Sequence, residues 1–142
     1  MAEQGQAVIN ASPLIFLSRS RYLSLLQNFA REIWVPDPVA GEIRHRGAQD
    51  ITVQAIEQTA WLISKPVPTI PTPVVEWRLG VGESSTLALA LEHPGTEAII
   101  DDLAGRKCAA SLGIPVRGTL GIVLVAKRRA VLFAKPGPLS RT

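Results

Sequence analysis

Short apolar runs separated by longer amphipathic stretches follow one another along this chain. Five runs are predicted strands, at residues 7–9, 32–35, 61–63, 98–100 and a short one from Val116. Their apolar residues are consecutive, which is typical of parallel strands buried on both faces. The intervening segments predict helices at residues 39–46, 50–59, 83–91, 103–112 and 119–129, with one or two short helices between Pro13 and Leu26. This alternation indicates an α/β sandwich in which helices cover both faces of a central parallel sheet.

Capping residues and prolines mark the ends of these elements. Ser12 and Pro13 predict the N-cap and first turn of the first helix, and Gly113 predicts the end of helix 103–112. Residues 65–73 hold four prolines and no periodic pattern, which predicts an extended surface connection and no domain linker. Because 142 residues is one domain's length, we predict a single domain over residues 1–142.

Composition narrows the class of protein. Hydrophobic residues make up 46% of the chain and charged residues 19%, which indicates a compact globular domain and excludes a disordered one. The single cysteine, Cys108, excludes an internal disulfide and is expected in the core. No segment has the pattern of a signal peptide or a membrane span, so we expect a cytoplasmic protein without membrane association.

Oxygen-bearing side chains stand where the predicted strands end or on the helices beside them. Asn10, Asp101 and Asp102 directly follow strands, whereas Glu42 and Glu83 lie on helices. Side chains at the carboxyl ends of parallel strands meet in one crevice. We therefore expect Asn10, Glu42, Glu83 and one of the two aspartates, Asp101 or Asp102, to converge there. Their oxygens are the ligands that a hard cation such as Mg²⁺ prefers, and bound Mg²⁺ can activate water for phosphodiester hydrolysis.

Each acid also has a plainer interpretation. Glu83 favours the dipole of the helix it begins, and Glu42 is an ordinary solvated helix acid. Asp101 and Asp102 suit an N-cap and a first-turn acid for the next helix, although two consecutive acids after a buried strand are costly without a cation or water to receive them. Each position alone favours the plain interpretation, and the set together favours a site.

Other kinds of site are disfavoured. Gly80-x-Gly82 lacks the third glycine of a dinucleotide fingerprint. His45 and His93 have no Cys or His at zinc-binding spacing. Aromatic residues make up only 5% of the chain, and the three tryptophans are expected to pack, so the sequence predicts no base-stacking platform. An aspartyl-phosphate mechanism is disfavoured because Asn10 stands where the nucleophilic Asp is needed.

An ordered set of segments resembles the PIN-domain family, the metal-dependent ribonuclease fold of many bacterial toxin–antitoxin systems. The closest likeness is to a subgroup of prokaryotic PIN proteins. The likeness covers most of the chain, and it rests on the segments Val8-Ile9-Asn10-Ala11-Ser12-Pro13, Val35-Pro36, Glu42-Ile43, Gly80-Val81-Gly82-Glu83-Ser84, Ile100-Asp101-Asp102 and Gly113-Ile114-Pro115-Val116-Arg117-Gly118-Thr119. It implies a three-layer sandwich with acids at one end of the sheet that bind Mg²⁺ or Mn²⁺ and support cleavage of single-stranded RNA.

The resemblance also assigns residues. Asn10 takes the place of the family's first-strand Asp, with Ser12 as its supporting hydroxyl, and Glu42 and Glu83 match the second and third acids. Asp102 is preferred as the fourth acid, with Asp101 as the alternative. Thr119 resembles a structural helix cap. Because an amide oxygen brings no charge, Asn10 weakens the expected attraction for the metal.

Two functions remain open. One is a metal-dependent endoribonuclease, paired as a toxin with a small antitoxin that blocks its site. The other is a catalytically weak or inactive PIN-type module that binds RNA or a protein partner. Basic clusters beside an acidic site suit a polyanion, and they lie at Arg19 and Arg21, at residues 44–46 and at residues 127–129. We also expect a homodimer, because leucines 14, 17, 23, 25 and 26 with Phe16 are more apolar than a short exposed helical pair needs.

Overall fold

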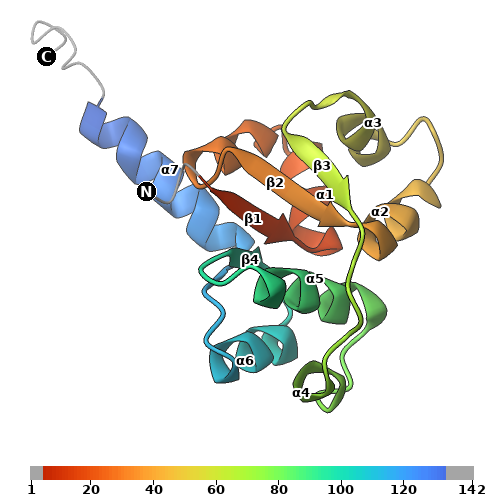
Figure 1. Cartoon of the computed structure of the whole chain (residues 1–142). Helices are drawn as coiled ribbons and strands as arrows, with labels where there is room; N and C mark the ends of the chain where they lie inside the picture. The colour runs from red at the N-terminus through yellow and green to blue at the C-terminus, as the bar shows by residue number, and fades with distance from the viewer. Residues whose placement is uncertain (1–4, 134–142) are drawn as a thin grey trace, which may run out of the picture.

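A five-stranded, all-parallel sheet forms the centre of the computed structural model, which describes residues 5–133. The strand order is β3-β2-β1-β4-β5, so β1 is the middle strand. Figure 1 shows this sheet with helices on both sides. The strands are β1 (Gln6–Ile9), β2 (Glu32–Pro36), β3 (Leu62–Lys65), β4 (Glu97–Ile99) and β5 (Val116–Arg117). The predicted three-layer α/β sandwich is confirmed.

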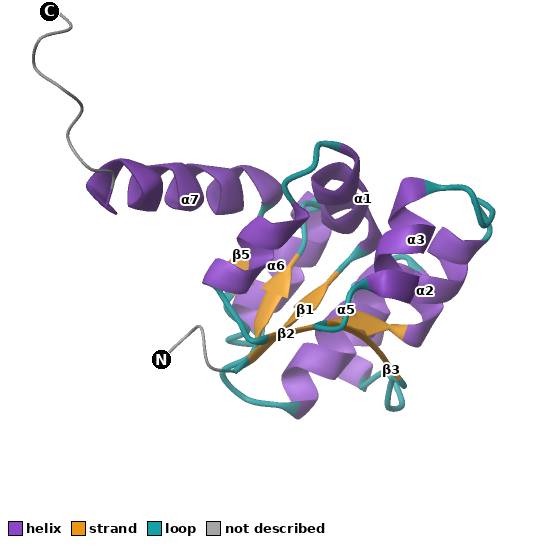
Figure 2. Cartoon of the chain, turned by 90° about the horizontal axis from the view of Figure 1, so that it is seen from above, coloured by secondary structure: helices purple, strands orange, loops and turns teal. Residues whose placement is uncertain are grey.

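Helical segments connect these strands. They are α1 (Ala11–Arg19), the 3₁₀ helix η2 (Leu23–Asn28), α2 (Asp37–Arg44), α3 (Ile51–Gln58), α4 (Thr72–Val75), α5 (Val81–Glu92), α6 (Leu103–Ser111) and α7 (Thr119–Phe133). In Figures 1 and 2, α7 extends away from the sheet beyond its first turns. Within the described residues, no helix has both the length and the apolar character needed to cross a membrane.

Two separate hydrophobic cores lie on the two faces of the sheet, because successive strand residues point to opposite sides. Ile9 and Ile33 belong to the core beneath α1, η2, α2, α3 and α7. Val8 and Trp34, each next to one of these residues, belong to the core beneath α4, α5 and α6. Cys108 is fully buried in this second core, as expected, and burial raises the pKa of its thiol.

Several expectations about single segments were wrong. Asn10, and not Ser12, is the N-cap of α1, since the helix begins at Ala11. The prolines of the 65–73 connection do not exclude a helix, because α4 begins there with a proline in its first turn, where proline is tolerated. The final helix continues to Phe133, beyond the expected end at Arg129.

The leucines that motivated the dimer are mostly core residues. Leu14, Leu17 and Leu26 are fully buried within the chain itself, and Leu23 and Leu25 pack against the same core. For the leucines this motive for self-association was wrong, because helices α3 and α7 supply the covering that the sequence pattern left unassigned, whereas Phe16 stays 52% exposed. The dimer itself stays a prediction.

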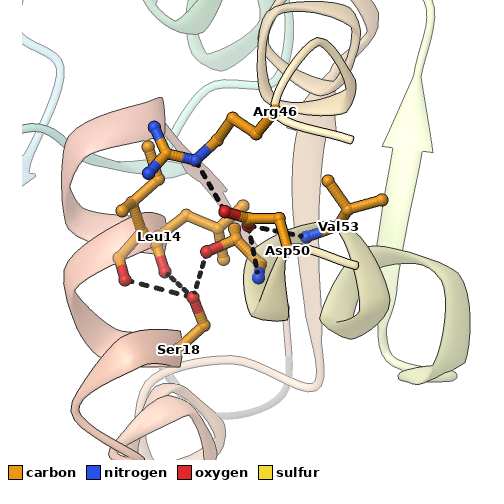
Figure 3. Close-up of polar contacts among 7 residues, drawn as sticks. Leu14, Ser18, Arg46, Asp50 and Val53 are labelled. Atoms are coloured by element: carbon orange, nitrogen blue, oxygen red, sulfur yellow. Dashed lines mark hydrogen bonds and ion pairs between the residues drawn. The ribbon is translucent and has the colours of Figure 1, made fainter. Parts of the chain in front are cut away.

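A polar network joins α1 to α3 (Figure 3). The hydroxyl of Ser18 hydrogen-bonds with that of Thr52 at 2.6 Å and donates to Leu14 O at 2.9 Å. Asp50 caps α3 and accepts from Arg46 at 3.0 Å and from the Thr52 backbone N–H at 2.8 Å. The Arg46 hydrogen bond, followed by the backbone donors, lowers the pKa of Asp50. This network fixes α3 on the side of α1 that faces away from the sheet's centre.

Candidate metal centre

Asn10 lies at the carboxyl end of the central strand. Its backbone N–H donates to Ile99 O at 3.0 Å, which fixes it against β4. The residue is only 2% exposed, and its Nδ2 donates to Oε2 of Glu83 at 3.2 Å. Its Oδ1 is buried without a hydrogen-bond partner among residues 5–133. Leaving such an oxygen unpaired costs about 1–3 kcal/mol, so a cation or a water here would recover that free energy.

Glu83 reaches Asn10 from the first turn of α5. Most of this helix is buried, from Ser85 to Ala90, so its start is held rigidly against the sheet. The carboxylate benefits from the helix dipole, and it also accepts a hydrogen bond from an amide that is itself buried. Glu83 can therefore stabilise the start of α5 and also take part in a site with Asn10.

Gly82 makes room for this arrangement. A Cβ built on Gly82 would lie 3.1 Å from Oδ1 of Asn10 and 3.5 Å from Oε1 of Glu42. Both oxygens therefore lie close to the same point, next to the bare backbone of α5. Glu42 comes from α2, where Val39, Ala40 and Ile43 face the core and Glu42 is exposed. Three elements, β1, α2 and α5, thus bring oxygens to one place.

Asp101 is engaged at the start of α7. Its Oδ1 accepts from the backbone N–H of Thr119 at 2.7 Å, and its Oδ2 accepts from the Thr119 hydroxyl at 2.6 Å. The carboxylate therefore ties the segment after β4 to the N-terminus of α7. Thr119 is 9% exposed and is the first residue inside that helix, so the cap expected at Thr119 was wrong by one residue, and its hydroxyl donates to Asp101.

Asp102 is the N-cap of α6. Its Oδ2 accepts from the backbone N–H of Gly105 at 2.7 Å, the geometry that a capping aspartate provides. Both aspartates thus have structural partners, and each is exposed. In the described part of the chain, no group of three or more Asp, Glu, His and Cys side chains is close enough together to hold a metal ion. The structure therefore gathers Asn10, Glu42 and Glu83, and a ligand role for either aspartate stays a prediction.

Ser12 lies on the first turn of α1 and is exposed. No hydrogen bond joins its hydroxyl to Asn10 within residues 5–133, so its supporting role also stays a prediction. Sequence reasoning missed the role of Gly82, whose lack of a side chain gives the oxygens of Asn10 and Glu42 their space. The Gly80-x-Gly82 pattern directly before Glu83 is the sequence signal from which this role could have been inferred.

The comparison with protein families matches this geometry. A family model described as a PIN domain matches residues 6–138, nearly the whole chain. The chain belongs to the PIN-domain family. It therefore has a nuclease-like fold. No curated protein matches the chain.

The residues of this PIN domain fit a hard divalent cation. The donor set is one amide oxygen and two carboxylates, and it contains no sulfur or imidazole that would favour a softer metal. The unpaired Oδ1 of Asn10 is an acceptor that such a cation would satisfy. With only two charged donors, Glu42 and Glu83, the set is weaker than one with an aspartate at position 10.

Proposed function

We propose that this PIN domain is a Mg²⁺- or Mn²⁺-dependent endoribonuclease acting on single-stranded RNA. The observation that best supports the proposal is the buried, unpaired Oδ1 of Asn10 beside the carboxylates of Glu42 and Glu83. Such an oxygen is costly unless a ligand uses it, and oxygen donors of this kind select a hard cation. The family's nuclease-like fold supplies the reaction class.

In this proposal each of the three residues has a defined role. The oxygens of Asn10, Glu42 and Glu83 hold the metal, which when bound supplies an activated water and neutralises charge on the phosphodiester. Asn10 also orients Glu83, because its Nδ2 donates to Oε2. The formal charge of the chain is +3, so its net charge does not oppose the approach of a polyanion.

The proposal includes partners. We infer that the protein is the toxin of a toxin–antitoxin pair and that a small antitoxin blocks the acidic edge of the sheet. We also infer that it acts in the cytoplasm and forms a homodimer. A short reading frame next to the gene would support the antitoxin. Sedimentation at high micromolar concentration tests the dimer, and a monomer there would contradict it.

An RNA-cleavage assay with Mn²⁺ tests the proposed reaction. Glu83→Gln keeps the size of the side chain and removes its charge, so cleavage should fall to background. Glu76→Gln, at an exposed glutamate outside the site, is the matched control and should cleave like the natural chain. Equal cleavage by Glu83→Gln and the natural chain would refute the proposal.

The second candidate function is a weak or inactive module that binds RNA or a protein. The observations that favour it are the missing charge at Asn10 and the engagement of both Asp101 oxygens by Thr119. An RNA that binds in EDTA and stays intact after Mn²⁺ is added would identify this function. Cleavage that depends on Glu83 would exclude it.

A further inference from the structure

Two adjoining cavities lie along the outer side of α1. They start at the edge of the sheet that carries the candidate metal centre, because their walls include Ser12, two residues after Asn10, and Asp101, which follows β4 beside β1. One has a volume of about 550 Å³ and is lined mainly by Ser12, Phe16, Tyr22, Asp101, Leu120 and Val123. The other has a volume of about 530 Å³ and is lined by Ser12, Ile15, Phe16, Arg19 and Ser20. Ser12 and Phe16 line both, so the two form one groove that begins at Asp101 and ends at Arg19. Each volume lies within the range of small-ligand sites.

Two aromatic side chains in this groove are exposed. Phe16 is 52% exposed, because α1 turns its neighbours Leu14 and Leu17 into the core and leaves Phe16 on the outer side. Tyr22 is 46% exposed. The low aromatic content predicted no base-stacking platform. Composition alone, however, does not show which of the few aromatic side chains remain exposed to solvent.

The C-terminal cap of α1 places Tyr22. Arg21 has a φ of 67°, in the left-handed region that non-glycine residues rarely adopt. The turn allows the backbone N–H of Tyr22 to donate to Leu17 O at 2.8 Å, which folds Tyr22 back against the end of α1. Together with the bond from the Arg21 N–H to Ser18 O at 3.3 Å, this is the Schellman pattern with which many helices end, and here it fixes the position of Tyr22.

The charges around the groove favour an anion. Arg19 and Arg21 are exposed, and neither takes part in an ion pair among residues 5–133. The one carboxylate in the groove wall, Asp101, accepts two hydrogen bonds from Thr119. Aromatic faces for bases, arginines for phosphates and a position at the acidic edge of the sheet are together the features of a single-stranded RNA site.

We propose that this α1 groove binds the nucleotides flanking the scissile phosphate, with a base stacked on Phe16 and a neighbouring base against Tyr22. The proposal rests on the proposed ribonuclease function only in placing the scissile phosphate at the metal centre. The test of RNA binding does not depend on cleavage. The groove selects single strands, because a base in a duplex does not offer its face to Phe16.

The test is fluorescence anisotropy with a labelled single-stranded RNA octamer of mixed sequence, in EDTA so that no cleavage occurs. Stacking on an aromatic side chain supplies about 1–3 kcal/mol per base, so Phe16→Ala should weaken binding by about 5- to 150-fold. Phe16→Trp should bind at least as well as the natural chain. Trp77→Ala removes an aromatic that is 38% exposed outside the groove and should change nothing. Arg19→Gln should weaken binding and reduce its salt dependence by about one phosphate contact.

The outcomes separate the groove from the reaction. Binding that depends on Phe16, without any cleavage in Mn²⁺, supports the groove and refutes the ribonuclease. Cleavage that depends on Glu83, with the same octamer affinity for Phe16→Ala and the natural chain, refutes the groove and supports the ribonuclease. No octamer binding at low salt overturns the groove as well. A dimer that dissociates on Phe16→Ala while RNA affinity is unchanged would identify a protein interface in its place.

Discussion

Replacing Asn10 by aspartate is the most direct test of the metal centre. The substitution keeps the oxygen donor and the size of the side chain and adds one negative charge. In the natural chain, Nδ2 of Asn10 donates to Oε2 of Glu83 at 3.2 Å, an attraction. In Asn10→Asp, a carboxylate oxygen faces the same Glu83 oxygen, and the attraction becomes a repulsion between like charges.

The distance gives the size of this effect. Two unit charges 3.2 Å apart interact by about 5 kcal/mol at an effective dielectric constant of 20. Glu83 is only half-buried, so it can turn away and relieve part of this repulsion in the metal-free protein. A divalent cation between the carboxylates relieves the rest. Relief of about 1.4 kcal/mol, little more than a quarter of the total, already tightens metal binding about tenfold.

Calorimetry with Mn²⁺ and thermal melting measure the two sides of this balance. Asn10→Asp should bind Mn²⁺ about tenfold more tightly than the natural chain, and its cleavage of RNA should rise. In EDTA it should melt several degrees lower, since about 1 kcal/mol corresponds to roughly 3 °C for a domain of this size. Mn²⁺ should then raise its melting temperature more than that of the natural chain.

Asn28→Asp is the matched control. Asn28 is partly buried, and its Nδ2 donates to Leu25 O at 3.0 Å. It lies in η2, which leads into the start of β2 and so is at the opposite end of the strands from the acids. This variant should leave the Mn²⁺ affinity unchanged. If Asn10→Asp and the natural chain have the same Mn²⁺ affinity and the same melting temperature in EDTA, position 10 is not part of a metal site.

Three further changes test the surroundings of the site. Gly82→Ala should weaken Mn²⁺ binding several-fold in calorimetry, because its methyl group fills the space beside the converging oxygens, whereas Gly121→Ala, with open space around it, should not. Asp101→Asn should lower the melting temperature equally with and without Mn²⁺ if the carboxylate only caps Thr119, and it should also weaken Mn²⁺ binding if it is a ligand. Asp50→Asn should melt below the natural chain at pH 7. Because the folded-state pKa of Asp50 is lowered from 3.8, this difference should shrink in melts as the pH falls below that value, and a difference that persists at pH 2 would contradict the reasoning.

Strands were easier to predict from the sequence than helix ends. Consecutive apolar residues such as Val8 and Ile9 are costly to leave in water on either face, so they determine a buried strand wherever they occur. A helix end depends on which residue adopts the extended cap conformation, and both Asn10 and Ser12 are good caps. The choice of Asn10 follows from its tertiary bond to Ile99, which no local pattern contains.

The edge of the sheet that holds the acids was likewise predictable, but the direction of each side chain was not. The acids follow the strands in sequence order, and parallel topology brings their backbone positions to one edge. Whether Asp101 faces the crevice or Thr119 depends on where α7 begins after a crossover through α6 and β5. Such long-range placement also decides that Leu17 is buried and Phe16 is exposed, although both lie on α1.

The amide at position 10 changes how the site is held together when no metal is bound. Three carboxylates around one point repel each other in the absence of a cation, and the fold must resist that repulsion. Here one of the three is neutral and donates a hydrogen bond to its neighbour Glu83, so the arrangement is attractive before any metal arrives. The cost is a lower affinity for the cation, because fewer charges hold it. Under the proposed function, contacts to the substrate away from the metal therefore matter more, and the exposed Phe16 and Arg19 of the proposed groove would supply affinity that does not depend on the metal.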